Sequence, residues 1–171
     1  MALILPAVKL EFANDAANPW TVSDECVING NRGKNETSSI LSFSFSTDAT
    51  TEISFEWKKS WYYGNNHFLE FFADGVCFGK TGESYESYSQ FNSISICVEK
   101  GSHTILFKDS IGSDWTDAEY DYSCIKNLEL KRIKQLSVDV TVPGAMGDSI
   151  LAKVDNFADV KSLKLSGALN D

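Results

Sequence analysis

A run of three aromatic residues followed by amides is the segment of this chain best suited to binding a ligand. Residues 61–66 read WYYGNN, and the period-2 alternation of a strand cannot bury all three adjacent rings. Flat aromatic faces stack on sugar rings, while asparagine amides hydrogen-bond sugar hydroxyls. This segment is therefore a candidate glycan platform, although packing of the rings as a lid over the core is the favoured interpretation. The candidate ligand-binding residues are Trp61, Tyr62, Tyr63, Asn65 and Trp115.

Residues for catalysis are sparse by comparison. His67 and His103 are the two histidines of the chain, so a base beside a nucleophile has few candidates. His103 begins an expected strand and is interpreted as structural, and His67 as a solvated surface residue. The carboxylates lie scattered through expected turns, without the paired context of a glycosidase. The sequence therefore favours a protein that is not an enzyme, with no catalytic residues.

Loop carboxylates could bind Ca²⁺, which prefers several oxygen ligands. The candidates are Glu11, Asn14, Asp15, Asp117, Glu119 and Asp121. Acidic turns are ordinary in a chain of net charge −9, however, and they are the favoured explanation of these residues. The expectation is therefore no cofactor and no metal ligand, with Ca²⁺ as the alternative.

Four cysteines are far apart in the sequence and include no C-x-x-C pair, which argues against a common zinc site. They are Cys26, Cys77, Cys97 and Cys124. Each falls in an apolar strand pattern, where a buried cysteine acts as a small hydrophobic residue. That interpretation is favoured, and disulfide bonds remain the open alternative.

Charge and hydropathy exclude two classes of partner. The net charge is −9 and the 15 Lys and Arg residues are scattered, whereas nucleic acid requires a clustered basic surface. No apolar run approaches the roughly 18 to 20 residues that span a bilayer. We expect neither nucleic-acid binding nor membrane insertion in this segment.

The elements that must position the candidate residues read as strands. Asp74-Gly75 separates two apolar runs within residues 68–80, which is a strong signal for a two-residue hairpin turn. Residues 40–46, 53–58 and 93–98 alternate apolar and polar side chains, and further strands are expected at 8–12, 25–28, 105–107 and 124–130. Short strands at a spacing of about ten residues predict an all-β fold, a jelly-roll-like antiparallel β-sandwich.

The C-terminal segment has a different pattern. Residues 136–142 predict a strand and 149–154 a short helix, and the sequence VKSLKLSGALN at 160–170 resembles the strand of a leucine-rich repeat. We expect a jelly-roll module at residues 1–133, followed at 134–171 by the N-terminal cap and first strand of a truncated leucine-rich repeat region. A single repeat leaves an apolar face and a strand edge uncovered, so self-association through this edge is expected.

A family resemblance rests on residues 101–114 (GSHTILFKDSIGSD), together with residues 18–21, 40–43 and 71–75. These stretches resemble adhesin-like and MAM-like jelly-roll modules of bacterial surface proteins and secreted peptidases, loosely over residues 8–130. The family's later Ala-Trp-Ile-Asp-Asn strand is matched here by residues 123–127, with Cys124 in place of the Trp and Lys126 in place of the Asp.

The resemblance implies an extracellular or cell-surface location and a non-catalytic adhesion module, with a glycan or a surface protein as partner. A purely structural cap for the repeat solenoid is the alternative function, and an accessory module of a carbohydrate-active enzyme is a third.

Overall fold

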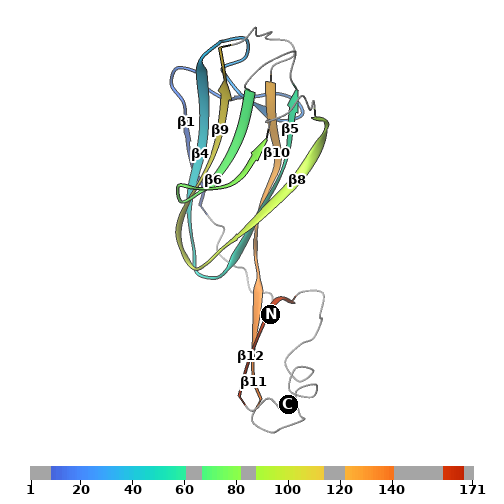
Figure 1. Ribbon diagram of the computed structural model, residues 1–171. Helices are drawn as coiled ribbons and strands as arrows, with labels where there is room; N and C mark the ends of the chain where they lie inside the picture. The colour runs from blue at the N-terminus through green and yellow to red at the C-terminus, as the bar shows by residue number, and fades with distance from the viewer. Residues whose placement is uncertain (1–8, 61–66, 82–87, 114–121, 141–159, 168–171) are drawn as a thin grey trace.

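The computed structural model describes residues 9–60, 67–81, 88–113, 122–140 and 160–167, and the regular elements of these segments are strands (Figure 1). Ten of them form two five-stranded antiparallel sheets. No helix able to cross a bilayer occurs in the described ranges. The predicted antiparallel β-sandwich is therefore confirmed.

The two sheets are named sheet A and sheet B. Sheet A contains, in spatial order, β1 (Glu11–Asn14), β4 (Thr37–Thr47), β9 (Gly101–Ile111), β6 (His67–Ala73) and β7 (Val76–Thr81). Sheet B contains β2 (Thr21–Val22), β3 (Val27–Ile28), β10 (Tyr122–Arg132), β5 (Thr51–Ser60) and β8 (Tyr88–Val98). From β4 to β10 successive strands alternate between the sheets, except at the β6–β7 hairpin, which is the connectivity expected of a jelly roll.

The core lies between the sheets and follows the alternation of the sequence. Phe43 on β4 and Phe107 on β9 project from sheet A, and Phe55 on β5 projects from sheet B. All three are at most 1% exposed, and the rings of Phe55 and Phe107 meet edge to face at 4.9 Å. Aromatic pairs of this geometry stabilise a core beyond the area that they bury.

The hairpin predicted at Asp74-Gly75 joins β6 to β7. Asp74 has φ 51° and Gly75 has φ 80°, so both central residues adopt the left-handed conformation that this turn requires. Leu69 and Phe71 of β6 face the core, as expected.

The expectation that all four cysteines are buried is wrong for two of them. Cys26 and Cys124 are buried, but Cys77 and Cys97 are exposed, and none of the four forms a disulfide bond. Cys77 and Cys97 lie on the edge strands β7 and β8. Cys97 is paired with Glu52 on the outer face of sheet B, because it alternates with the inward-facing Val98.

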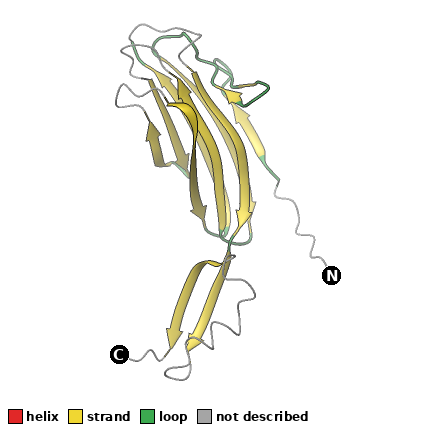
Figure 2. Ribbon diagram, turned by 90° about the vertical axis from the view of Figure 1, so that its right-hand side faces the viewer, coloured by secondary structure: helices red, strands yellow, loops and turns green. Residues whose placement is uncertain are grey.

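The C-terminal strands β11 (Lys134–Val140) and β12 (Val160–Gly167) form a separate parallel pair. In Figures 1 and 2 this pair lies beyond one end of the sandwich, as a continuation of β10. Both predicted C-terminal strands are thus present, while the helix expected at 149–154 lies outside the described residues.

Candidate functional site

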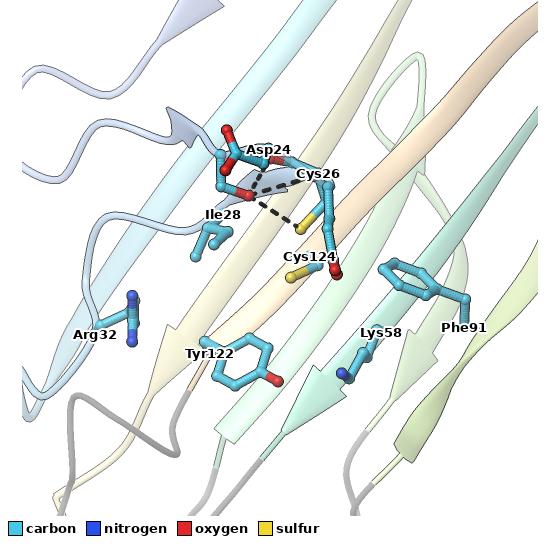
Figure 3. A pocket seen from close by; sticks show the side chains of 10 residues that line it. Asp24, Cys26, Ile28, Arg32, Lys58, Phe91, Tyr122 and Cys124 are labelled. Atoms are coloured by element: carbon cyan, nitrogen blue, oxygen red, sulfur yellow. Dashed lines mark hydrogen bonds between the residues drawn. The ribbon is translucent and has the colours of Figure 1, made fainter.

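The clearest candidate site is a hollow of about 380 Å³ on the outer face of sheet B (Figure 3). Lys58 on β5 and Cys124 on β10 are cross-strand partners, so their side chains share this face. The other lining residues come from the β2–β3 connection, from β3 and the loop after it, and from β8 and β10. They are Ser23, Asp24, Glu25, Cys26, Ile28, Arg32, Phe91 and Tyr122. We refer to this feature as the sheet B hollow.

One side of the sheet B hollow is formed by a tight bend that carries two carboxylates. Ser23 donates its hydroxyl to the Cys26 carbonyl at 2.9 Å, and the Ser23 backbone N–H donates to the same oxygen at 2.8 Å. These bonds close the bend and hold Asp24 and Glu25, both exposed, at the rim. The bend therefore supplies hydrogen-bond acceptors to the site.

The opposite side carries an aromatic ring between two cations. The Tyr122 ring centroid lies 5.6 Å from Lys58 Nζ and 5.7 Å from Arg32 Cζ. A hydrogen bond with Tyr122 raises the pKa of Lys58, against the opposing effect of burial, and the charge of Glu25 raises it further. Lys58 therefore stays protonated at neutral pH and acts as a donor.

A second ring, Phe91 of β8, borders the same hollow. Lys126 Nζ lies 3.7 Å from its centroid and also forms an ion pair with Glu56 at 3.4 Å. Lys58 Nζ lies 5.9 Å from the same centroid, so Phe91 and Tyr122 are both half-buried rings that lie under cations.

The sheet B hollow therefore combines an aromatic ring with donors on one side and acceptors on the other. A sugar presents apolar C–H faces and hydroxyls that both donate and accept, so this combination matches its chemistry. A volume near 380 Å³ also falls within the range of small-molecule pockets, roughly 300 to 1,000 Å³.

The ligand-binding residues predicted from the sequence lie outside the described residues. This applies to Trp61, Tyr62, Tyr63 and Asn65 as well as to Trp115. The strands that flank these segments are described, however. Ser60 ends β5 directly before residue 61, and Tyr122 begins β10 directly after residue 121. Ser60 and Tyr122 are cross-strand partners. Both predicted segments are thus joined to strand ends beside the sheet B hollow.

Sequence reasoning missed the residues of the hollow itself. Alternation placed Lys58 correctly on the solvent-facing side of β5, but it could not reveal that β10 lies beside β5 and that β3 lies beyond β10. Tyr122 falls outside the strand expected at 124–130, because the apolar pattern of that strand begins only at Cys124. The site forms because β10 pairs with β3 and β5, and no local sequence motif indicates these pairings.

The proposed Ca²⁺ ligands that are described have other partners. Asp15 Oδ1 accepts the backbone N–H groups of Ala17 and Asn18 at 2.7 and 3.0 Å, and Asn14 is bonded to the backbone of Trp20. Glu11 pairs with Lys9 at 2.9 Å. Within the described part of the chain no group of three His, Cys, Asp or Glu is placed to hold a metal ion. Asp117, Glu119 and Asp121 lie outside it.

His67 contradicts its interpretation as a solvated surface residue. It is fully buried and its Nε2 lies 2.7 Å from Asp109 Oδ2, which also accepts the Ser123 hydroxyl at 2.5 Å. Asn29 donates to Asp109 Oδ1 at 3.0 Å and to Asn31 Oδ1 at 2.7 Å. The expectation failed because His67 opens β6 on its inward side, where a buried carboxylate from β9 meets it.

This cluster contains serine, histidine and aspartate but lacks the arrangement of a hydrolase. In a catalytic triad the histidine lies between the serine and the aspartate. Here Ser123 and His67 both bind Oδ2 of Asp109, so the aspartate lies between the other two residues. All three residues are 0% exposed, which leaves no path for a substrate. We interpret the cluster as structural support. Ser123 lies on β10 between Tyr122 and Cys124, so the cluster fixes the strand that lines the sheet B hollow.

His103 has the structural role expected of it. Its Nδ1 lies 2.7 Å from Asp74 Oδ2 and its Nε2 lies 2.7 Å from the Glu99 carbonyl, while Asp74 Oδ1 accepts the Thr104 N–H at 2.8 Å. Burial opposes the charging of His103, but the hydrogen bonds to Asp74 and Glu99 outweigh it and raise its pKa. The hydrogen bond from His103 in turn lowers the pKa of Asp74. This pair fastens the β6–β7 turn to β9.

We expect this pair to make stability depend on pH. Because the pKa of His103 is raised on folding, its contribution is complete below about pH 6.5 and is lost as pH rises through the folded value. Because the pKa of Asp74 is lowered, its contribution is complete above about pH 3.9 and is lost as pH falls through the folded value. Urea unfolding should therefore show that His103→Gln costs more stability near pH 5.5 than near pH 8.5. An equal cost at both pH values, or the same pH dependence in an Asp74→Asn background, would contradict this assignment.

A second hollow, also of about 380 Å³, lies against β1, β4 and β9 of sheet A. Its lining includes paired hydroxyls, Ser44 with Thr104 at 3.0 Å and Ser46 with Ser102 at 2.9 Å. Its one aromatic lining residue, Phe45, is only 4% exposed. This hollow lacks an open ring for stacking, so the sheet B hollow is the better candidate.

Comparisons with known proteins define the fold class. No protein-family model matches the sequence, and no curated protein matches it. The secreted serine protease VesC from Vibrio cholerae is similar in structure, with a TM-score of 0.57 and 14% identity over 70% of this chain and 24% of that chain. The chain thus spans about a quarter of that protease, and at this identity the likeness shows a shared β-sandwich fold.

Two further solved structures are more distant. A family 35 carbohydrate binding module from Clostridium thermocellum has a TM-score of 0.35 and 11% identity over 69% of this chain and 90% of that one. A cycloisomaltooligosaccharide glucanotransferase from Paenibacillus has a TM-score of 0.32 and 13% identity over 77% of this chain and 17% of that one. Neither likeness is close enough to support an argument about this chain.

Proposed function

We propose that the chain is a non-catalytic glycan-binding module and that the sheet B hollow is its binding site. One observation supports this most strongly: Tyr122 lies between Lys58 and Arg32 on one side of a hollow whose other rim carries Asp24 and Glu25. Donors, acceptors and an aromatic ring are thus within reach of one sugar residue. Segments 61–66 and 114–121 join the strand ends at this site, so Trp61 and Trp115 would extend the platform.

A glycan array followed by calorimetric titration with a bound oligosaccharide tests this proposal. We expect Tyr122→Ala to weaken binding by at least about tenfold, or roughly 1.4 kcal/mol, because the stacking ring and the anchor of Lys58 are both removed. Phe68→Ala is the matched control, since Phe68 is also half-buried on an outer face under a lysine, with Lys80 Nζ 4.3 Å from its ring, but belongs to sheet A. It should bind like the original protein.

Two outcomes would contradict this proposal. Equal losses in the two variants would place the binding site elsewhere. A folded protein that binds no oligosaccharide on the array would favour the alternative, a structural cap. Trp61→Ala separates the contribution of the predicted aromatic loop from that of Tyr122.

We further propose that β11 and β12 begin a leucine-rich repeat region. Their ladder supports this, because Leu136 pairs with Leu163 and Val138 with Leu165 in parallel, so that equivalent apolar positions are 27 residues apart. Leucine-rich repeats have periods of about 20 to 29 residues and stack parallel strands. A surface-displayed protein with an extracellular location follows from this proposal and from the adhesin-like resemblance.

The edge of this two-stranded sheet is proposed as a self-association surface, since an edge strand offers unpaired backbone groups to another chain. Light scattering at high concentration should show dimers or larger species that disappear when residues 134–171 are removed. A strict monomer in both forms would contradict the proposal.

A further inference from the structure

Two thiols from different strands lie together on the floor of the sheet B hollow. Cys26 precedes β3 and is 8% exposed, while Cys124 lies on β10 and is 4% exposed. Figure 3 shows the two sulfur atoms as neighbours in the hollow. Burial raises the pKa of the Cys124 thiol, and the neighbouring Cys26 raises it further.

The other two cysteines are placed differently. Cys77 and Cys97 are exposed on β7 and β8, which are edge strands of different sheets. The thiol of Cys77 has its own partner, the Gly79 carbonyl at 3.4 Å. The fold therefore selects a single pair of cysteines among the four.

The segment that contains Cys26 has little else to hold it. β2 and β3 are two residues long each, and β3 pairs with β10 through Ile28 with Cys124 and Val27 with Ile125. Cys26 is two residues before Ile28, the cross-strand partner of Cys124, so it lies on the same outer face, diagonally opposite Cys124. A covalent bond at this point would fasten the β2–β3 bend, with Asp24 and Glu25, to the central strand of the sheet.

We propose that Cys26 and Cys124 form a disulfide bond in the presence of a low-molecular-weight disulfide such as oxidised glutathione. The Cys26 thiolate attacks one sulfur of the oxidant, forming a mixed disulfide and releasing one glutathione thiolate. The Cys124 thiolate then attacks the Cys26 sulfur, forming the protein disulfide and releasing the second glutathione. The two protein thiols lose two electrons and two protons, and the two released thiolates take up the protons.

The bond has two consequences for the molecule. It closes a long loop of chain, from residue 26 to residue 124, and cross-links of long loops restrict the unfolded state most strongly. It also fixes the acceptor rim of the sheet B hollow against β10. The inference does not depend on the proposed function, because it concerns only the two thiols.

The test is a count of thiols open to alkylation before and after oxidation of the native chain, residues 1–171, by oxidised glutathione. After denaturation and alkylation, mass spectrometry should find all four cysteines alkylated in the reduced protein and only Cys77 and Cys97 alkylated in the oxidised one. Trypsin separates the four cysteines into different peptides, so the cross-linked pair can be identified directly. The melting temperature should rise on oxidation of the original protein and stay unchanged in Cys26→Ser.

A Cys77→Ser, Cys97→Ser double variant should form the same bond within one chain, and not between two chains. Four alkylated cysteines after oxidation, a cross-link between another pair, or a glutathione adduct that persists on Cys26 would each overturn the proposal.

Discussion

Replacement of Asp109 by alanine is expected to lower the free energy of unfolding by about 3 to 5 kcal/mol, or to prevent folding. Asp109 is fully buried and accepts hydrogen bonds from Asn29 and Ser123 and bonds His67. Its removal leaves these three buried groups without their acceptor, and each such loss costs about 1 to 3 kcal/mol. Chemical denaturation followed by tryptophan fluorescence measures the change.

Asp48→Ala is the control for this prediction. Asp48 pairs with Arg132 at 2.9 Å, but its side chain is 65% exposed, and exposed ion pairs contribute about 0 to 1 kcal/mol. A cost at Asp109 no larger than that at Asp48 would show that the buried cluster does not hold the sheets together. Because the cluster supports β10, a folded Asp109 variant should also lose affinity at the sheet B hollow.

Replacement of Phe107 by alanine should destabilise the sandwich by about 3 to 5 kcal/mol through the cavity that it leaves. Phe107 is 1% exposed, and its ring contacts those of Phe43, Phe55 and Phe71 at centroid distances of 6.1, 4.9 and 6.1 Å. It therefore joins aromatic residues of both sheets at the centre of the core. The midpoint of thermal unfolding should fall accordingly.

Phe12→Ala serves as the comparison for Phe107. Phe12 also contacts Phe43, at 5.7 Å, but it is 60% exposed on the edge strand β1. We expect its loss to cost well under half as much, since less apolar area is removed from contact. Similar costs at both positions would mean that the core does not depend on the sheet-to-sheet contact made by Phe107.

The sequence was sufficient to predict the sandwich because its signals are local. Alternation along residues 40–46 and 53–58 specifies which face of each strand is buried, and Asp74-Gly75 specifies a turn. The observed strands extend further, as β4 (Thr37–Thr47) and β5 (Thr51–Ser60), because backbone pairing continues past the apolar positions.

The site depends on contacts that local pattern does not encode. The sequence indicated a solvated surface residue at His67, but its burial depends on Asp109, 42 positions away. Cys26 and Cys124 are separated by most of the chain and meet only because β3 pairs with β10. The exposure of Cys97, by contrast, could have been predicted, since it alternates in phase with the outward-facing Ser93 and Ser95.

The central claim is that an oligosaccharide binds in the sheet B hollow, and chemical-shift mapping by NMR tests it most directly. Titration of the isotope-labelled chain with an oligosaccharide selected on the array should shift the signals of Lys58, Tyr122 and Cys124, together with those of the bend that carries Asp24 and Glu25. The signals of Phe68 on the outer face of sheet A should remain in place. Shifts confined to sheet A, or binding that leaves the signals of Lys58 and Tyr122 unchanged, would contradict the account.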